Sequence, residues 1–569
     1  MRMRPPPVAR TGLAGLALAL AGAAPLLHAQ TPSAGNPLSQ LPAPAPIPQP
    51  AAVAPQVELR APAGPSGSAL DRALTPTRFD IEGVDALAFA DVARRFTPLV
   101  GRPTTVGQLV AIAGELSTLY KDSGLPLSFV YVPDQRFEGG VVRIVAVEGY
   151  IASVRIEGDA GPATPKLRAM AEHLTRERPL RIATFERVTQ LLARLPGLQV
   201  SAEASMPGST DGATALVLKV RREPYNVSVG ADLRQPTSRA VLSGVWNDPL
   251  LPGSQISAST LLGDLRREKL LSLGYTQLVG TDGLALKAQV TAYNGYPDKR
   301  AQEGAPLERY NTNRRVELSA SYPLLLSPRS SLTLNGGFYG VDNTDDYRVP
   351  ATGLRLIDQS RVRALFAQLA CADAQPERSR SASLLLARGI DGLGASSELR
   401  SNAPGLSGPG SSKLDFTRLT LDASQRDRFA NRWGTAFGLG AQYSPDSLAA
   451  SERIAFGGAR FGRGYAAGDG AGDSGWGLSA ELNRAFPLDM VWLRQVEPYL
   501  LLEAAHVSTK LGQPVPRSLR SVALGVRLTD AKHYNLDLAV AKPTGDPAVD
   551  NPERKLRLSV QLSYQLAAP

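Results

Sequence analysis

The sequence predicts two fold classes in series: small α+β modules near the N-terminus, then an all-β transmembrane barrel of about 16 antiparallel strands. Three observations predict this architecture. The first 29 residues have the pattern of a secretory signal, and residues 75–222 twice repeat the order strand, helix, helix, strand, strand. From Tyr225 onward, segments of about ten residues alternate apolar with polar side chains. The chain is therefore expected to be exported and to cross a membrane with strands.

Residues 1–29 are expected to be a signal peptide. Three arginines precede a short run of alanine and leucine, and Leu27-His28-Ala29 offers a cleavage site. The apolar run is too short for a membrane-spanning helix. Residues 30–74 follow as a Pro/Ala-rich N-terminal segment and linker, whose composition favours an extended chain and shows no clear amphipathic helix.

Two α+β modules are expected at 75–150 and 151–222. In the first, Thr105 and Gln108 have the spacing of a capping box at the start of a helix. In the second, Phe185, Val188 and Leu191 line one face of a helix. A single α+β domain across both units is the alternative.

Residues 223–569 are expected to form the barrel. In the last strand Leu556, Leu558 and Val560 share one face while Arg557 and Ser559 share the other, the period-two pattern of a membrane strand. Long connections tend to alternate with short turns, and an even strand count returns both barrel ends to the periplasmic side. A soluble sandwich or propeller is the alternative, but the signal peptide and the length of the alternating block favour the barrel.

Composition excludes several classes of function. The net charge of +10 is spread along the chain, so no nucleic acid is expected as a partner. A single cysteine, Cys371, cannot form an intramolecular disulfide, and the four histidines are scattered. No catalytic constellation, nucleotide loop or metal cluster is evident, so neither an enzyme nor a cofactor is expected.

The longest outer connection, residues 444–476, carries the one motif that stands out. Gly457 and Gly458 precede Arg463-Gly464-Tyr465 in a glycine-rich stretch. Glycines let the backbone turn tightly and pack closely, and a guanidinium group stays charged and pairs well with carboxylates. We call this segment the signature loop.

Together these features resemble the outer-membrane transporters of two-partner secretion (TpsB), the haemolysin and filamentous-haemagglutinin transporter family of the POTRA-barrel superfamily. That family has two periplasmic POTRA domains and a barrel of about 16 strands. The loop motif resembles the family signature in order and spacing, together with Gly475, Trp476 and Glu481. A second set of residues resembles the end of the first POTRA domain: Pro133, Gln135, Gly140, Glu148, Gly149 and Tyr150.

The resemblance implies a protein translocator in the Gram-negative outer membrane, with its POTRA domains in the periplasm. Its partners would be a large secreted exoprotein, outer-membrane lipid, and the chaperones and barrel-assembly machinery of the periplasm. In the family the loop arginine is held in the barrel lumen by an acidic residue, here Glu503 or Glu481. Leu501 and Ala505 depart from the family pattern around Glu503. A factor that assembles other outer-membrane proteins is the alternative function.

Overall fold

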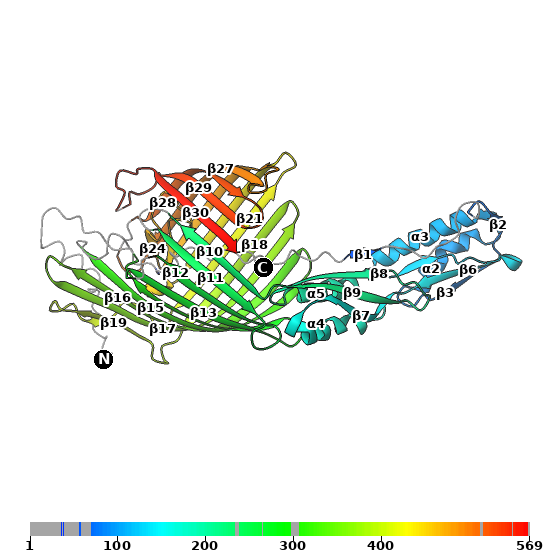
Figure 1. Ribbon diagram of the computed structural model, residues 1–569, viewed down its shortest axis with the longest axis horizontal. Helices are drawn as coiled ribbons and strands as arrows, with labels where there is room; N and C mark the ends of the chain where they lie inside the picture. Colours follow the sequence, from blue (N-terminus) through cyan, green and yellow to red (C-terminus); the bar gives the residue numbers. More distant parts are fainter. Residues whose placement is uncertain are drawn as a thin grey trace, which may run out of the picture.

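The computed structural model describes residues 36, 38, 56–58, 70–233, 238–263, 266–297, 307–512, 516–548 and 550–566. The expected signal peptide, and most of the expected N-terminal segment and linker, lie outside these residues. Figure 1 shows a long molecule with the barrel at one end and two small modules at the other. Among the described residues, no helix is both long and apolar enough to span a membrane.

The first module packs two helices on a three-stranded sheet of order β3-β6-β5, with β3 parallel to β6. The capping box expected at Thr105 and Gln108 is present at the start of α3. One face of α3 fills the core through Leu109, Leu116 and Tyr120. The elements are β2 (Ala73–Leu74), β3 (Arg78–Glu82), α2 (Phe89–Phe96), β4 (Thr104–Thr105), α3 (Val106–Asp122), β5 (Phe129–Tyr131) and β6 (Val141–Val147).

The second module repeats this arrangement and adds a strand from the linker. Its sheet has the order β1-β8-β9-β7, in which β1 (Gln56–Glu58) pairs in parallel with β8. The Pro/Ala-rich composition gave no indication of this strand. The remaining elements are β7 (Tyr150–Gly158), α4 (Thr164–Ala171), α5 (Ile182–Ala193), β8 (Leu198–Ser205) and β9 (Ala213–Arg222).

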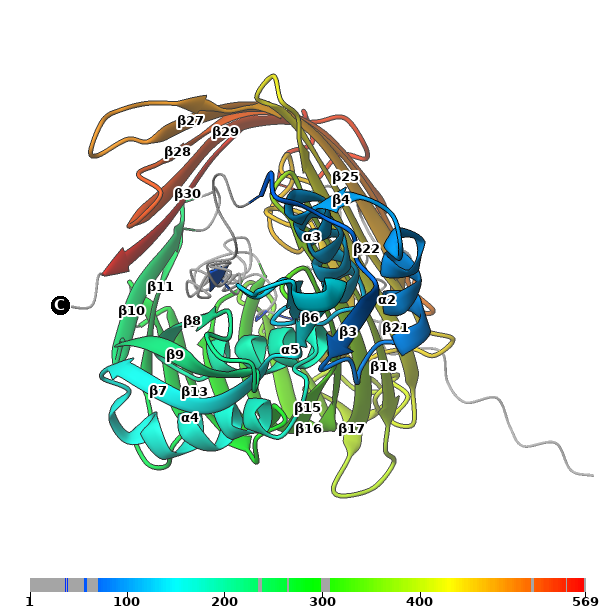
Figure 2. The same ribbon diagram turned by 90° about the vertical axis from the view of Figure 1, so that its right-hand side faces the viewer.

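The second module is attached to one rim of the barrel. Leu326, at the end of a barrel strand, belongs to the core of this module. Lys166 donates to the Leu278 carbonyl, and the Arg187 guanidinium donates to the Pro323 carbonyl at 3.2 Å. The module is therefore docked on one side of the rim, in front of β13–β15 in the view of Figure 2.

The barrel closes through sixteen antiparallel spanning strands, as expected. They are β10 (Tyr225–Asp232), β11 (Arg239–Asn247), β12 (Ser254–Leu262), β13 (Glu268–Val279), β14 (Leu284–Gly295), β15 (Glu308–Leu326), β16 (Ser330–Val349), β17 (Leu354–Gln375), β18 (Arg378–Gly389), β21 (Thr417–Arg428), β22 (Trp433–Tyr443), β25 (Ser474–Arg484), β27 (Gln495–Ser508), β28 (Ser518–Thr529), β29 (Tyr534–Pro543) and β30 (Arg557–Leu566).

Closure is made by β10 and β30, which pair from Val227↔Leu566 to Asp232↔Gln561. Three short strands extend the wall: β19 (Ser396–Ser401), β20 (Gly408–Pro409) and β26 (Phe486–Pro487). Side chains alternate across the wall as the period-two pattern requires. On β27, Tyr499, Leu501, Glu503 and Ala505 are all buried, while Leu500 and Leu502 are exposed on the outer surface.

Two described residues of the N-terminal segment lie inside the barrel. Leu38 packs against Val241, Leu261, Leu270 and Tyr293, and the Asn36 amide donates to the Ser451 carbonyl at 3.1 Å. The composition of this segment favours an extended chain and shows no clear amphipathic helix. The contacts of Asn36 and Leu38 show that part of it nevertheless reaches the lumen.

Candidate functional site

The signature loop folds back into the barrel. It runs from residue 444 to 473, because β22 ends at Tyr443 and β25 begins at Ser474. Two short strands, β23 (Ile454–Phe456) and β24 (Gly470–Gly472), pair to form its stem. Gly457 has a φ of 108°, and a Cβ there would lie 2.2 Å from the Ala466 carbonyl oxygen, so only glycine fits this turn.

Arg463 sits at the tip of the loop with its side chain nearly buried. Its guanidinium forms an ion pair with Asp537 of β29, with 3.3 Å between Nη1 and Oδ2, and each side chain is 12% exposed. Nη1 also donates to the Tyr499 hydroxyl, which donates in turn to Asp537 at 2.6 Å. Arg463, Tyr499 and Asp537 therefore form one connected charged group on the lumenal face of the wall.

The two carboxylates expected from the sequence lie nearby but do not bind the guanidinium. Glu503 accepts a 2.7 Å hydrogen bond from the main-chain N–H of Arg463 and another from Ser521. Glu481 is occupied by Arg527, whose Nη1 donates to it at 2.7 Å. The prediction that Glu503 or Glu481 pairs with the Arg463 guanidinium is therefore wrong. The loop backbone passes beside Glu503, and the long arginine side chain continues past β28 to Asp537.

Arg527 ties these groups into a larger network. Besides Glu481, it pairs with Glu497 at 2.8 Å, and its Nε lies 3.6 Å from Asp537. Arg463 and Arg527 thus share one carboxylate, and both guanidinium groups lie over the Tyr499 ring. The negative charge of Asp537 is consequently balanced from two sides.

Gly464 and Tyr465 complete the fit of the tip. A Cβ on Gly464 would lie 2.6 Å from the Pro543 main-chain nitrogen, so the loop backbone packs directly on β29. Tyr465 is 1% exposed and packs with Phe456, Val507 and Leu519. Its hydroxyl donates to the Asp546 carbonyl at 2.9 Å. All three residues of the Arg-Gly-Tyr triplet therefore contact the same side of the barrel.

The base of the loop is held by two buried carboxylates that sequence reasoning missed. Glu452, 1% exposed, accepts from the Tyr339 hydroxyl at 2.7 Å and pairs with Arg418 at 3.3 Å. Asp473 is fully buried and accepts from the main-chain N–H groups of Leu448 and Lys510. Neither acidic residue lies in a recognisable motif, so the sequence carried no signal for them.

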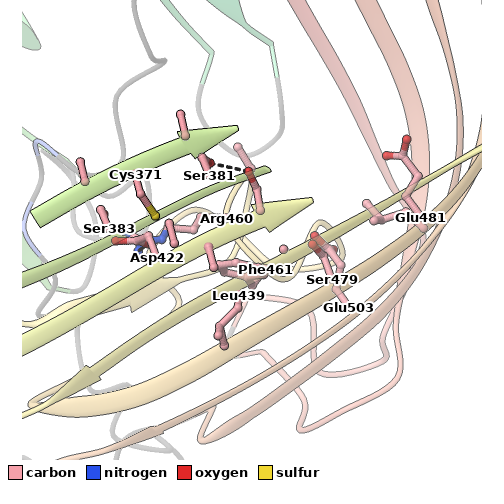
Figure 3. A pocket seen from close by; sticks show the side chains of 18 of the residues that line it. Cys371, Ser381, Ser383, Asp422, Leu439, Arg460, Phe461, Ser479, Glu481 and Glu503 are labelled. Atoms are coloured by element: carbon pink, nitrogen blue, oxygen red, sulfur yellow. Dashed lines mark hydrogen bonds and ion pairs between the residues drawn. The ribbon is translucent and has the colours of Figure 1, made fainter. Parts of the chain in front are cut away.

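A cavity of about 590 Å³ remains in the lumen beside the loop. It is lined by Arg460, Phe461 and Arg463 of the loop and by wall residues that include Leu439, Ser479 and Glu503. Figure 3 shows Phe461 against this wall, with Glu481 standing apart from Glu503. Within the described part of the chain, no three His, Cys, Asp or Glu side chains gather in a way that could hold a metal ion.

The six residues that resemble the end of a first POTRA domain all make contacts that stabilise the first module or its junction with the second. Gln135 bonds both main-chain groups of Arg143, and a single oxygen of Glu148 accepts from Asp85 N, Ala86 N and the Tyr120 hydroxyl. Burial and this bond to Glu148 raise the pKa of Tyr120 above its usual range. Pro133 accepts a weak 3.4 Å bond from the Gln135 amide.

The glycines of this set fit where a side chain would collide. A Cβ on Gly149 would lie 2.3 Å from the Leu127 carbonyl oxygen, and one on Gly140 would lie 2.8 Å from Thr77 Cγ2. Tyr150 begins β7 under the guanidinium of Arg178, 4.0 Å from the ring centre. These six residues therefore hold the first module together and join it to the second.

Two family models match the chain. The POTRA domain, ShlB-type, matches residues 74–149, and the haemolysin secretion/activation protein ShlB/FhaC/HecB matches residues 271–528. The heme/hemopexin transporter protein HuxB of Haemophilus influenzae (strain 86-028NP) is 22% identical over 475 residues, 80% of each protein. The outer membrane transporter CdiB of Escherichia coli is 27% identical over 175 residues, 30% of this chain and 29% of that protein.

Solved structures share the fold. CdiB from Escherichia coli superposes with a TM-score of 0.65 at 20% identity, covering 90% of this chain and 94% of that one. CdiB from Acinetobacter baumannii gives a TM-score of 0.56 at 14% identity, covering 99% and 100%. BamA from Haemophilus ducreyi, lacking its POTRA domains 1–3, gives 0.51 at 14% identity, covering 87% and 100%. The fold is therefore that of outer-membrane barrels with attached POTRA domains.

Proposed function

Because the chain belongs to the outer-membrane transporter family of two-partner secretion, we propose that it recognises one dedicated large exoprotein in the periplasm and exports it through its barrel. The family matches make it a protein-secretion transporter of the outer membrane with POTRA domains in the periplasm. They favour secretion over the assembly of other membrane proteins, since the ShlB/FhaC/HecB match covers residues 271–528 of the barrel. The proposal adds that one dedicated exoprotein is recognised and that it crosses the membrane through the barrel.

The proposal assigns a role to each segment of the chain. Residues 1–29 direct export and are removed, residues 30–74 link the lumen to the modules, and the POTRA domains at 75–150 and 151–222 receive the unfolded exoprotein. Sheet edges of the POTRA domains can accept an extended segment by adding a strand. Residues 223–569 form the pathway through the membrane. Periplasmic chaperones and the barrel-assembly machinery act while the transporter itself is made.

The observation that carries the proposal is the seating of the signature loop. A permanently charged side chain, Arg463, is brought into the lumen and matched to Asp537, while Glu503 fixes the backbone beside it. An ion pair held in one geometry at low exposure is suited to define one loop position. We propose that the loop in this position is required for export, because it fixes the shape of the pathway.

A co-expression experiment tests the receptor role of the first module. The full-length transporter is co-expressed with a candidate exoprotein, chosen as a large repeat-rich protein from a neighbouring gene, and that exoprotein is measured in the culture medium. Deleting residues 75–150 is expected to stop export while the barrel still inserts and conducts in planar bilayers. Export at wild-type level by the deletion variant would refute the receptor role.

A further inference from the structure

The ring of Phe461 lies on a patch of barrel wall where three glycines face the lumen beside Ser479. Gly438 and Gly440 of β22 and Gly477 of β25 face the lumen beneath it; we call them the glycine groove. Their neighbours Phe437 and Trp476 point outward and are 52% and 43% exposed. Figure 3 shows Phe461 near Ser479 of β25.

Side chains at these positions would exclude the ring. A Cβ on Gly477 would lie 2.7 Å from both Cγ and Cδ2 of Phe461, and one on Gly440 would lie 2.8 Å from Cε2. A Cβ on Gly438 would lie 2.6 Å from the Ser479 Oγ and 3.3 Å from Cε1 of Phe461, so Ser479 crowds this position more closely than the ring does. None of the three glycines has the positive φ that would require glycine for backbone reasons. At Gly440 and Gly477 the space is therefore explained by the ring and not by the strand conformation.

The backbone conformation of Phe461 indicates that its surroundings hold the residue in place. Its φ of 52° is in the left-handed region, which a bulky residue adopts at a cost. Contacts on several sides hold it there. The ring meets Phe456 edge to face with 5.8 Å between centroids, and the preceding residue, Arg460, pairs with Asp422 of β21 at 2.7 Å.

Two sets of contacts therefore fix the loop tip to different parts of the wall. Arg460 and Phe461 are fastened to β21, β22 and β25, whereas Arg463 and Tyr465 contact β27, β29 and the connection after it. Only Gly462 separates the two sets. Where the ring sits consequently determines how far the Arg463 guanidinium can reach.

We propose that Phe461 is a positioning residue of the signature loop, and that the glycine groove is its binding site on the wall. Seating the ring sets the register in which Arg463 meets Asp537, and the tip leaves the wall only when the ring leaves the groove. This inference rests on the proposed function for its link to export. The seating itself is measurable without any exoprotein.

The test is a double-mutant cycle on the full-length protein in isolated outer membranes. The rate of tryptic cleavage after Arg460 and Arg463 reports how often the tip is released. Gly477→Ala is the informative wall variant, because the three atoms nearest to its Cβ all belong to Phe461. Gly336→Ala on β16 is the matched control, since its Cβ would meet only the Phe366 carbonyl oxygen at 3.5 Å.

Phe461→Ala and Gly477→Ala are each expected to raise cleavage about tenfold or more, and the double variant no further than Phe461→Ala alone, because the collision needs both groups. Gly336→Ala is expected to match wild type. Equal effects of Gly477→Ala with and without Phe461 would overturn the proposal, as would unchanged cleavage in Phe461→Ala.

Barrel integrity is checked by the heat-dependent shift in gel mobility. If Gly477→Ala fails to insert, Gly440→Ala replaces it in the same cycle. Export of the exoprotein by these variants is measured separately. Released tips with normal export would support the seating of Phe461 and contradict only its link to the proposed function.

Discussion

Asp537→Asn should release the tip of the signature loop more strongly than any change at Glu503. The substitution keeps the shape and one acceptor for the Tyr499 hydroxyl but removes the charge opposite Arg463. At 3.3 Å the pair has an attraction of about 5 kcal/mol at an effective dielectric constant near 20. Loss of one member of such a buried pair costs roughly 3–5 kcal/mol, because the other charge is left uncompensated.

The lower end of this range applies, because Arg463 keeps its bond to Tyr499. About 3 kcal/mol corresponds to roughly a hundredfold rise in the released population. Glu503→Gln retains an oxygen for the Arg463 main-chain N–H and should cost only about 1 kcal/mol, roughly fivefold. Glu481→Gln is the matched control, because Glu481 binds Arg527 and does not touch Arg463.

The assay is tryptic cleavage after Arg463 in the folded, membrane-embedded protein. Cleavage follows the population of the open form when opening is fast compared with proteolysis. The expected order of rates is Asp537→Asn, then Glu503→Gln, then Glu481→Gln near wild type. A faster rate for Glu503→Gln than for Asp537→Asn would refute the assignment of Asp537 as the counter-charge.

Two further outcomes are expected. Glu452→Gln should cost about 2 kcal/mol at the base of the loop, less than the roughly 3–5 kcal/mol of a fully broken buried pair, because Arg418 loses the carboxylate but keeps its bond to the Glu452 carbonyl. Tyr339 keeps an acceptor. Tryptic cleavage after Arg453 should rise, and an unchanged rate there would contradict this expectation. Tyr120→Phe should lower the free energy of unfolding of the first module, measured by urea denaturation at neutral pH, by about 1 kcal/mol. The raised pKa of Tyr120 means that wild type gains stability from the neutral phenol below pH 10.0 and loses it as pH rises further. The phenylalanine variant should lack this alkaline loss, and an equal loss in both proteins would count against the bond to Glu148.

The strand pattern was predictable wherever one face of a strand meets lipid. In β14 the alternation is regular from Leu284, where the structure also starts the strand. β15 and β17 begin at Glu308 and Leu354, ahead of the residues at which their alternation becomes regular. The first residues of β15 include Arg309, Asn311 and Asn313 on the buried face. Polar residues there remove the contrast between faces on which the prediction depends.

The site was predictable only in part, for a geometric reason. The motif indicated Arg463 and its neighbours, and the alternation of β27 indicated that Glu503 faces inward. Which carboxylate meets the guanidinium depends on where the loop tip crosses the wall, which no local pattern records. The sequence shows that Asp537 is an acidic residue between Leu536 and Leu538 in an alternating strand. Several other carboxylates also face the lumen, so the pattern does not single out Asp537. The strand β1 was missed because it pairs through its backbone, which composition does not reveal.

Export by an Arg463→Ala variant is the most direct test of the account. The transporter and its exoprotein are co-expressed, and exoprotein in the medium is compared at equal amounts of inserted barrel. The account predicts that Arg463→Ala abolishes or sharply reduces export, because the tip loses its charge pair with Asp537. Normal amounts of exoprotein in the medium of that variant would contradict it.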